Sequence, residues 1–300
     1  ISINGQEIDG KDFNNYLDVI ENGVERLLAR GEEHPTEFEV LTAVAFQYFA
    51  DQDIDIAVLE VGLGGRLDAT NIVDPLVSVI TPISYDHMNV LGNTLTEIAH
   101  EKAGIIKPKR PVIIAPQSEE AQTEILHVAT LQEALAIVVN QAYTWQSTHH
   151  TLESQHITIQ NQDTNPQNED SLIPIELDIP LLGQHQADNA ATSLAALEVI
   201  RQAGFSISKE SIRQGFQNVH WQTRFEILRK DPPFITDAAH NGDSMQKLRQ
   251  ALDDYFPDLP FILLFGASAD KSLTAMLDII MPRVEAVVCT QSIHPRAADA

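Results

Sequence analysis

The stretch IDIAVLEVGLGGRLDATN, residues 54–71, decides the fold class. Its apolar first part predicts a buried strand over 54–59, which ends at Glu60 and continues into a loop with three glycines, Arg66 and Asp68. A strand that delivers a carboxylate to the edge of a sheet, followed by a tight glycine loop, is typical of charged-ligand sites in α/β proteins. The stretch therefore predicts an α/β fold with such a site behind the strand.

Strand and helix patterns alternate along most of the chain. Apolar residues three or four apart predict helices over 10–30 and after Thr36, where Glu39 completes the spacing of a capping box. Further elements are predicted as strands at 76–81, 111–115, 136–140, 234–237, 260–265 and 284–289, and as helices at 94–104, 118–135, 185–204, 243–256 and 271–281. This order predicts a mostly parallel sheet flanked by helices, with a second, incomplete α/β domain.

Residues 142–182 break this order, because apolar and polar residues alternate there around a Gln/Asn-rich turn. They predict a small antiparallel excursion, to which we assign no function. We predict a central domain over 1–222, a hinge over 223–233 and a C-terminal domain over 234–300.

Composition excludes several classes of protein. The formal net charge of −24 opposes binding to nucleic acid or to an anionic membrane surface. The single cysteine, Cys289, excludes an intramolecular disulfide, and no apolar run approaches the roughly 18 residues of a membrane span. We expect a cytoplasmic, monomeric protein, and we expect the chain to be a fragment at both ends because it begins without Met and stops in a loop.

Polar side chains follow several of the predicted strands. Asp86 and His87 follow the strand at 76–81, as Glu60 follows the strand at 54–59. Carboxylates and an imidazole from neighbouring strands can share one divalent cation, with Mg²⁺ favoured if phosphate oxygens and water complete its shell. Lys102, in an apolar helix, is a weaker candidate, since most helix lysines reach solvent.

The second half of the chain supplies further candidates. Arg224, in WQTRFE, is suited to grip phosphate, and Asp237 ends a strand where it can accept hydrogen bonds from ribose. His240 and Asn241 come next in TDAAHN and are expected to face the first domain. Asp270 and Lys271 end the following strand.

Six sequence blocks, in order, resemble one known family. They are EVGLGGRLDATN, DHMNVLGNTLTEIAHEKAGIIK, GQHQADNAATSLAAL, WQTRFE, DAAHN and ADKSLTAML. The chain resembles folylpolyglutamate synthase/dihydrofolate synthase, a branch of the Mur ligase superfamily, over residues 1–300 except 142–172. The resemblance implies a Mur ligase-like central ATPase domain and a Rossmann-like C-terminal domain. It also implies an ATP- and Mg²⁺-dependent enzyme that adds L-glutamate to folate or dihydropteroate through an acyl phosphate.

The resemblance also implies roles for residues of the first domain. Glu60 and His87 are then magnesium ligands, and Asp68 contacts the pterin-bearing substrate. Lys102 is the lysine that is carbamylated in this family, where its new carboxylate helps to hold a second metal.

The remaining implied roles concern the nucleotide and the amino acid. Asn189, spaced from His185 as in the family, and Arg224 hold the nucleotide, and Asp237 holds its ribose or phosphate. His240 binds the incoming glutamate. The two implied catalytic residues are Lys102 and His240.

The chain departs from the family pattern at one point, because G-x-x-x-x-G-K-[ST] does not occur in it. We therefore expect the phosphate-binding loop to lie upstream of these residues. Two alternatives stay open: a non-catalytic remnant that has lost ATP positioning, and a metal-dependent hydrolase that uses Glu60, Asp86 and His87.

Overall fold

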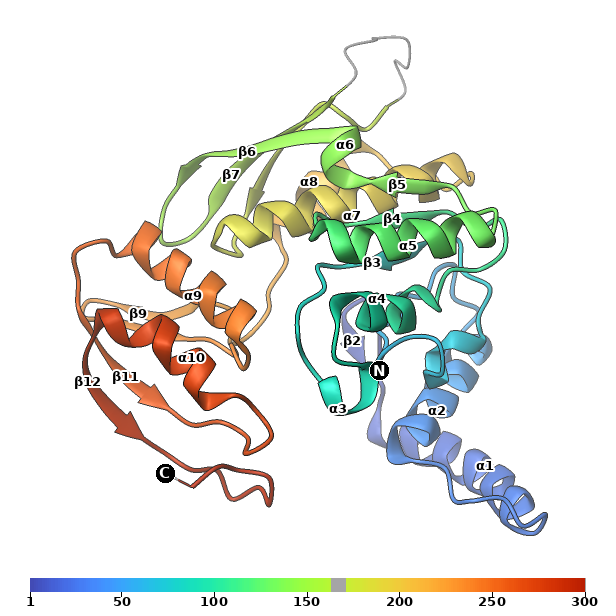
Figure 1. The fold of residues 1–300 in the computed structure, drawn as a ribbon. Helices are drawn as coiled ribbons and strands as arrows, with labels where there is room; N and C mark the ends of the chain where they lie inside the picture. Colours follow the sequence, from blue (N-terminus) through green and yellow to red (C-terminus); the bar gives the residue numbers. More distant parts are fainter. Residues whose placement is uncertain (163–170, 300) are drawn as a thin grey trace. The chain divides into compact units, whose positions relative to one another are not determined.

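The computed structural model describes residues 1–162 and 171–299, which form the helices and strands of Figure 1. The chain divides into two compact units, Ile1–Asp74 and Pro75–Ala300. None of the helices in the described ranges combines the length and the apolar character that a membrane crossing requires. The predicted Gln/Asn-rich turn falls mainly on 163–170, outside the described residues.

Unit 1 consists of a short hairpin and two long helices. Its elements are β1 (Ser2–Ile3), β2 (Gln6–Glu7), α1 (Gly10–Leu28), α2 (Glu37–Asp51) and the 3-10 helix η1 (Ala69–Ile72). Tyr16 of α1 meets Tyr48 of α2 edge to face, with the ring centroids 5.6 Å apart. The predicted capping box is confirmed, since the Thr36 hydroxyl accepts from the Glu39 N–H and the Glu39 carboxylate accepts from the Thr36 N–H.

The strand predicted at 54–59 is wrong. These residues form no helix or strand, and Val58 is 94% exposed. A strand needs a hydrogen-bonded neighbour. In unit 1 the two described strands, β1 and β2, pair only with each other, so the apolar run at 54–58 has no partner there.

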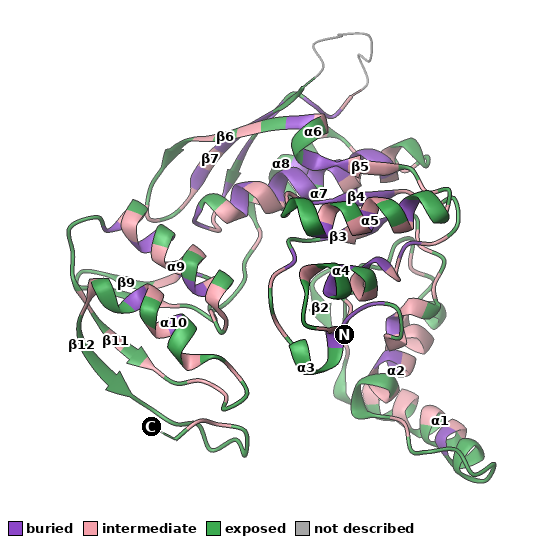
Figure 2. Cartoon of the chain, in the orientation of Figure 1, coloured by how far each residue is buried: buried purple, intermediate pink, exposed green. Residues whose placement is uncertain are grey.

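Unit 2 is built around a parallel sheet in the order β3-β4-β5. Its first elements are β3 (Ser78–Ile80), α3 (Met88–Leu91), α4 (Leu95–Ala103), β4 (Val112–Ile114), α5 (Glu119–Leu131), β5 (Ala136–Val138) and α6 (Val139–Ala142). Both faces of the sheet are buried (Figure 2), as is usual for parallel strands. Val112 and Ile114 of β4 belong to the apolar core with α4 and α5, whereas Ile113 between them belongs to the core with α7.

An antiparallel sheet in the order β6-β7-β8 follows, so the predicted excursion is confirmed. Its strands and the two helices after it are β6 (Tyr143–His150), β7 (Gln155–Asn161), β8 (Ile175–Ile179), α7 (Gln184–Gln202) and α8 (Lys209–Gln217). Ile157, Ile159 and Leu177 of this sheet share one core with Leu194 of α7. The excursion therefore contributes to the hydrophobic core beside the parallel sheet.

Residues 223–299 form what we call the C-terminal lobe. Its elements are β9 (Glu226–Lys230), β10 (Pro233–Thr236), α9 (Gly242–Tyr255), β11 (Phe261–Phe265), α10 (Leu273–Ile280), the 3-10 helix η2 (Met281–Arg283) and β12 (Val284–Cys289). β11 and β12 are parallel and β9 and β10 antiparallel. The lobe has a core of its own, which includes Met245, Leu252, Met276 and Ile280. The fold class predicted from the alternation is thus confirmed, while β9 was not predicted.

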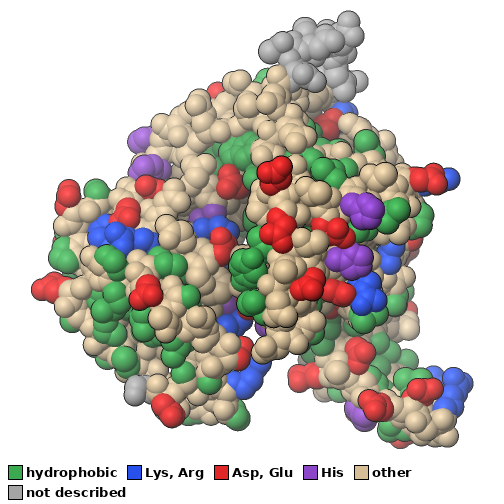
Figure 3. Space-filling view, viewed as in Figure 1, with side chains coloured by type: hydrophobic (Ala, Val, Ile, Leu, Met, Phe, Trp, Pro, Cys, Tyr) green, Lys and Arg blue, Asp and Glu red, His purple; other side chains and the backbone are tan. Residues whose placement is uncertain are grey.

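The negative charge is visible on the surface of unit 2, where acidic side chains gather over α4 and α5 in Figure 3. Glu120 of α5 accepts hydrogen bonds from the N–H and hydroxyl of Thr96, at 3.0 and 2.9 Å. Glu124 lies 2.8 Å from His100 Nδ1. Part of this acidic face thus serves to join α4 to α5.

Candidate active site

The loop behind Glu60 is held together by the carboxylate of Asp68. Asp68 Oδ2 accepts hydrogen bonds from the backbone N–H groups of Gly62 and Leu63, both at 3.0 Å. Its Oδ1 accepts from the N–H of Thr70 at 2.9 Å and from the Thr70 hydroxyl at 2.5 Å. Burial opposes ionisation, but these hydrogen bonds outweigh it and lower the pKa of Asp68. Asp68 therefore fixes the loop, and its predicted substrate contact stays a prediction.

The same loop lies directly against α2. A Cβ atom at Gly62 would lie 2.7 Å from the ring of Phe38, a distance that real Cβ atoms essentially never show. A side chain at this position would therefore require the exposed ring of Phe38 to shift. Glu60, two residues earlier, is an exposed residue of unit 1.

In unit 2, Asp86 follows β3 and gathers four groups around its carboxylate. Oδ1 accepts from the His87 N–H at 2.8 Å and from Lys271 Nζ at 2.7 Å. Oδ2 accepts from Asn241 Nδ2 at 3.1 Å, and His240 Nε2 lies 3.4 Å away. Burial opposes the charged form, but the bonds from Lys271, Asn241 and His87 prevail and lower the pKa of Asp86 to about 2. The Asp86 and Lys271 side chains are 23% and 13% exposed, so solvent screens this ion pair weakly.

His87 stands at the start of α3 in the left-handed conformation, with φ of 50°. This conformation is uncommon for residues other than glycine. The Asp86 carboxylate accepts a hydrogen bond from the N–H of His87. The His87 side chain is about half exposed, and its Nε2 lies 3.9 Å from Asp86 Oδ1. The imidazole is therefore open to a ligand from solvent.

The predicted magnesium ligands, Glu60 and His87, come from different units of the chain. In the part of the chain that the structure describes, no three His, Cys, Asp or Glu side chains are grouped as a metal cage. Mg²⁺ commonly keeps several waters and takes one or two carboxylates together with substrate phosphates, so a complete protein cage is not required. Glu60 belongs to unit 1 and His87 to unit 2, and their convergence on one ion stays a prediction. Asp86, also predicted near the cation, is engaged with Lys271 and Asn241 instead.

Lys102 lies in the last turn of α4, where it is partly buried. Burial lowers the pKa of its amine, and the negative charge of Asp86 partly opposes that shift. The neutral amine, which is the nucleophilic form, is therefore easier to reach here than for a lysine in solvent.

Asp237 organises the start of the C-terminal lobe. Its Oδ2 accepts from the Phe225 N–H and its Oδ1 from the Ala239 N–H, both at 2.8 Å. Thr223 and Phe225, on either side of Arg224, both have positive φ, of 56° and 47°. Asp237 binds the N–H of Phe225, and Glu226 Oε2 accepts from the N–H of Thr223 at 2.8 Å. Burial by the surrounding chain disfavours the charged carboxylate and so raises the pKa of Asp237. The residue is still partly open to solvent. The nucleotide roles predicted for Asp237 and Arg224 stay predictions.

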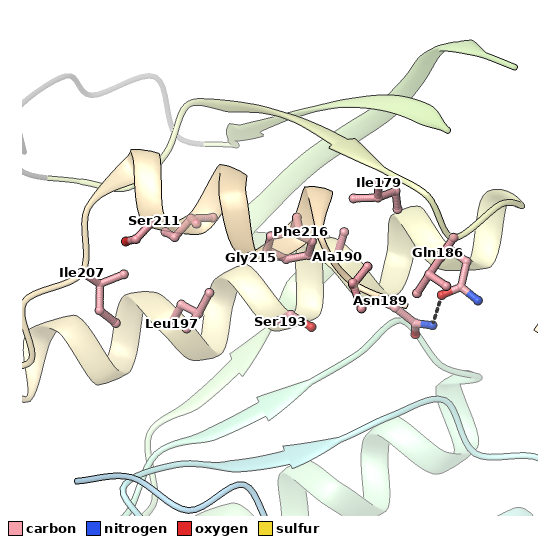
Figure 4. Close-up of a pocket in the computed structure, with 13 residues that line it drawn as sticks. Ile179, Gln186, Asn189, Ala190, Ser193, Leu197, Ile207, Ser211, Gly215 and Phe216 are labelled. Atoms are coloured by element: carbon pink, nitrogen blue, oxygen red, sulfur yellow. Dashed lines mark hydrogen bonds between the residues drawn. The ribbon is translucent and has the colours of Figure 1, made fainter. Parts of the chain in front are cut away.

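The first two turns of α7 carry His185 and the other predicted nucleotide residue, Asn189. Burial, with the charges of Lys247 and Arg224, lowers the pKa of His185 to about 4, so this imidazole is neutral at pH 7. Asn189, one turn on, donates from Nδ2 to Gln186 Oε1 at 3.1 Å, and both amides line one end of a cavity of about 440 Å³ between β8, α7 and α8 (Figure 4). The cavity is otherwise mostly apolar.

The structure thus joins candidates from distant parts of the sequence. His240 and Asn241 face the exit of β3, as the sequence suggested, and Lys271 joins them. No sequence pattern indicated that Lys271 would pair with Asp86, because 185 residues separate them.

Comparison with known families defines the class of protein. The model of the Mur ligase middle domain matches residues 14–197, and that of the Mur ligase glutamate ligase domain matches residues 223–300. The fold described above is therefore that of a Mur ligase.

Individual relatives narrow the assignment. A dihydrofolate synthase/folylpolyglutamate synthase of Bacillus subtilis is 35% identical over 99% of this chain and 68% of its own length. One of Mycobacterium tuberculosis is 32% identical over 100% of this chain and 63% of its own. The chain belongs to the dihydrofolate synthase/folylpolyglutamate synthase family, which confirms the resemblance seen in the six sequence blocks.

Solved structures agree with this. Mycobacterium tuberculosis folylpolyglutamate synthase, complexed with ADP and AMPPCP, has a TM-score of 0.87 and 32% identity, over 99% of this chain and 66% of that one. An FPGS–AMPPCP–folate complex has a TM-score of 0.81 and 30% identity, over 92% of this chain and 65% of that one. The present residues therefore span about two thirds of these structures.

Proposed function

We propose that the full-length protein is an ATP-dependent ligase that joins L-glutamate to the carboxylate of a folate or of dihydropteroate. Relatives with these names and neighbours complexed with nucleotide and folate support the proposal. One feature of this chain carries the proposal. Lys271 and His240 lie beside Asp86, after the end of β3, and the negative charge of Asp86 also acts on Lys102. The carboxyl end of a parallel strand, where charged and polar groups from two lobes meet, is the place at which α/β folds bind their ligands.

The reaction we propose has two balanced steps. A carboxylate oxygen of the folate attacks the γ-phosphorus of ATP, the bond to the β-phosphate oxygen breaks, and ADP leaves. The neutral amine of L-glutamate then attacks the acyl carbon, inorganic phosphate leaves with the carboxylate oxygen, and the nitrogen loses a proton to form the amide. Excluding water protects the acyl phosphate between these steps.

Several residues of this chain have proposed roles in those steps. His240, two residues before α9, is proposed to bind the incoming glutamate. Lys102 has the lowered pKa that reaction of its amine with CO₂ requires, which supports the proposed carbamylation. Asp68 is proposed to contact the pterin-bearing substrate through the loop that it organises.

Magnesium and nucleotide binding are proposed for the predicted residues. Glu60 and His87 would hold Mg²⁺, which supplies charge neutralisation to the phosphates when bound. Asn189 and Arg224 would hold the nucleotide and Asp237 its ribose or phosphate. The domain boundaries at 222 and 234, a monomeric state and a cytoplasmic location also stay proposals.

Substitution of Glu60 tests the function. In the full-length protein, Glu60→Ala should lower glutamate-dependent phosphate release from MgATP by about 10²–10³-fold, because charge stabilisation in the transition state is lost. Release is measured with dihydropteroate and with tetrahydrofolate, which also identifies the accepted substrate. Asp55→Ala, which removes another exposed carboxylate of the same segment, is the matched control. Retained activity in Glu60→Ala would refute the metal assignment.

A further inference from the structure

The carboxylate of Asp86 joins two parts of unit 2 that have separate cores. Asp86 leaves β3, whose Ile80 belongs to the core with α4 and α5. Its side-chain partners, Asn241 and Lys271, come from two loops of the C-terminal lobe, 155 and 185 residues further along the chain. Each oxygen thus accepts a hydrogen bond from one side chain of that lobe, and His240 Nε2 lies 3.4 Å from Oδ2 as well.

Both partners have further ties within the C-terminal lobe. Asn241 is the N-cap of α9, where its Oδ1 accepts from the Ser244 N–H at 2.9 Å while its Nδ2 donates to Asp86. The Lys271 N–H donates to the Ser268 carbonyl at 3.1 Å, in the loop that leads to α10. The carboxylate is therefore connected to the starts of both helices of the lobe.

The same carboxylate also binds the backbone of a candidate metal ligand. Asp86 Oδ1 accepts from both the His87 N–H and Lys271 Nζ. His87 has positive φ, so its backbone conformation depends on the contacts that hold it. Lys271, at 13% exposure, cannot lose its carboxylate partner without leaving a poorly solvated cation behind.

We propose that Asp86 is a latch between the central sheet and the C-terminal lobe, and that through it docking of Lys271 and Asn241 positions His87. Asp86 is thus a positioning residue rather than a group that touches substrate. The catalytic part of this inference rests on the proposed ligase function, whereas the latch itself does not.

Hydrogen exchange tests the latch without any assay of activity. Lys271→Met, on the C-terminal lobe, should speed exchange of the His87 amide about tenfold. Asp86→Asn, on the central part, should speed exchange of the Ser244 amide by the same factor. Both effects are expected because a hydrogen bond to a charged group is lost. Asp270→Asn, an exposed carboxylate in the same loop as Lys271, is the matched control and should change neither amide. Changes confined to the loop that carries the substitution would overturn the latch.

Kinetics of the full-length enzyme test the positioning role. Asp86→Asn and Lys271→Met should each lower kcat about 100-fold with little change in KM for ATP, since a misplaced group impairs the reaction more than binding. Lys271→Arg should retain most of the activity, because it keeps the ion pair. The double variant should be no slower than the slower single variant, whereas multiplied losses would contradict coupling through one contact. If the wild-type enzyme shows no ligation, the proposed function fails, and hydrogen exchange still decides the latch.

Discussion

Two aspartates of this chain use the same chemistry over very different distances. Asp68 binds the backbone and hydroxyl groups of residues two to six positions away, so its carboxylate closes a single loop. Asp86 binds its neighbour His87 but also Asn241 and Lys271, from another lobe. The first carboxylate defines local structure, and the second joins distant segments.

The difference teaches where a charged residue is expected to matter. A carboxylate that serves its own loop should have local effects when it is changed. Substitution of a carboxylate that joins distant elements should affect both of those elements. A third carboxylate, that of Glu198 on α7, allows a test remote from the candidate active site. Glu198 accepts from Arg201 Nη2 at 2.7 Å and from the Leu172 N–H at 3.1 Å, and is buried.

The largest expected effect on stability is that of Glu198→Gln. At pH 7 the substitution should lower the free energy of unfolding by about 1.5–3 kcal/mol, since buried hydrogen bonds to a charged group are lost. Denaturant unfolding measures this. Glu210→Gln, an exposed carboxylate on α8, is the matched control and should stay within about 0.5 kcal/mol of wild type.

The difference in unfolding free energy between wild type and Glu198→Gln should also depend on pH. Burial disfavours the charged form of Glu198, but the hydrogen bonds from Arg201, Leu172 and Gln202 outweigh it and lower its pKa. A lowered carboxyl pKa stabilises the fold above the unfolded pKa of about 4.3, and this contribution is lost as pH falls through the folded pKa. The gap between wild type and Glu198→Gln should therefore shrink below about pH 4. A gap that stays constant down to pH 2 would contradict the assigned ionisation.

A smaller and more local effect is expected for Asp68→Asn. An amide nitrogen cannot accept a hydrogen bond, so two of the four bonds to Asp68 are lost. Exchange of the Gly62 and Leu63 amides, or of the Thr70 amide, should rise about tenfold, while amides of unit 2 keep their rates. Asp55→Asn serves as the control. Faster exchange throughout unit 2 would break the contrast between the two aspartates.

Local signals made much of the fold predictable from the sequence. The capping box at Thr36 and Glu39 depends on residues three positions apart, and it forms. The apolar run that becomes β4 was also predictable, because parallel strands bury continuous apolar segments. The apolar run at β11 was predicted as a strand too, although Ile262 and Leu264 in it are exposed.

Features that depend on distant partners were not predictable in the same way. The apolar run at 54–58 has the composition of a strand but no pairing partner in unit 1. β9 has three exposed residues among its five, so its pattern resembles a hinge more than a strand. The acidic and basic motifs around Asp86 and Lys271 were each visible, but their pairing arises only from the fold.

Oxygen transfer from the substrate to phosphate tests the central claim most directly. The full-length protein is given dihydropteroate whose carboxylate is labelled with oxygen-18, together with MgATP and L-glutamate, and the phosphate released is analysed by mass spectrometry. A ligase that acts through an acyl phosphate transfers one labelled oxygen into each phosphate. Phosphate that is released at the rate of amide formation without the label would contradict the proposed reaction.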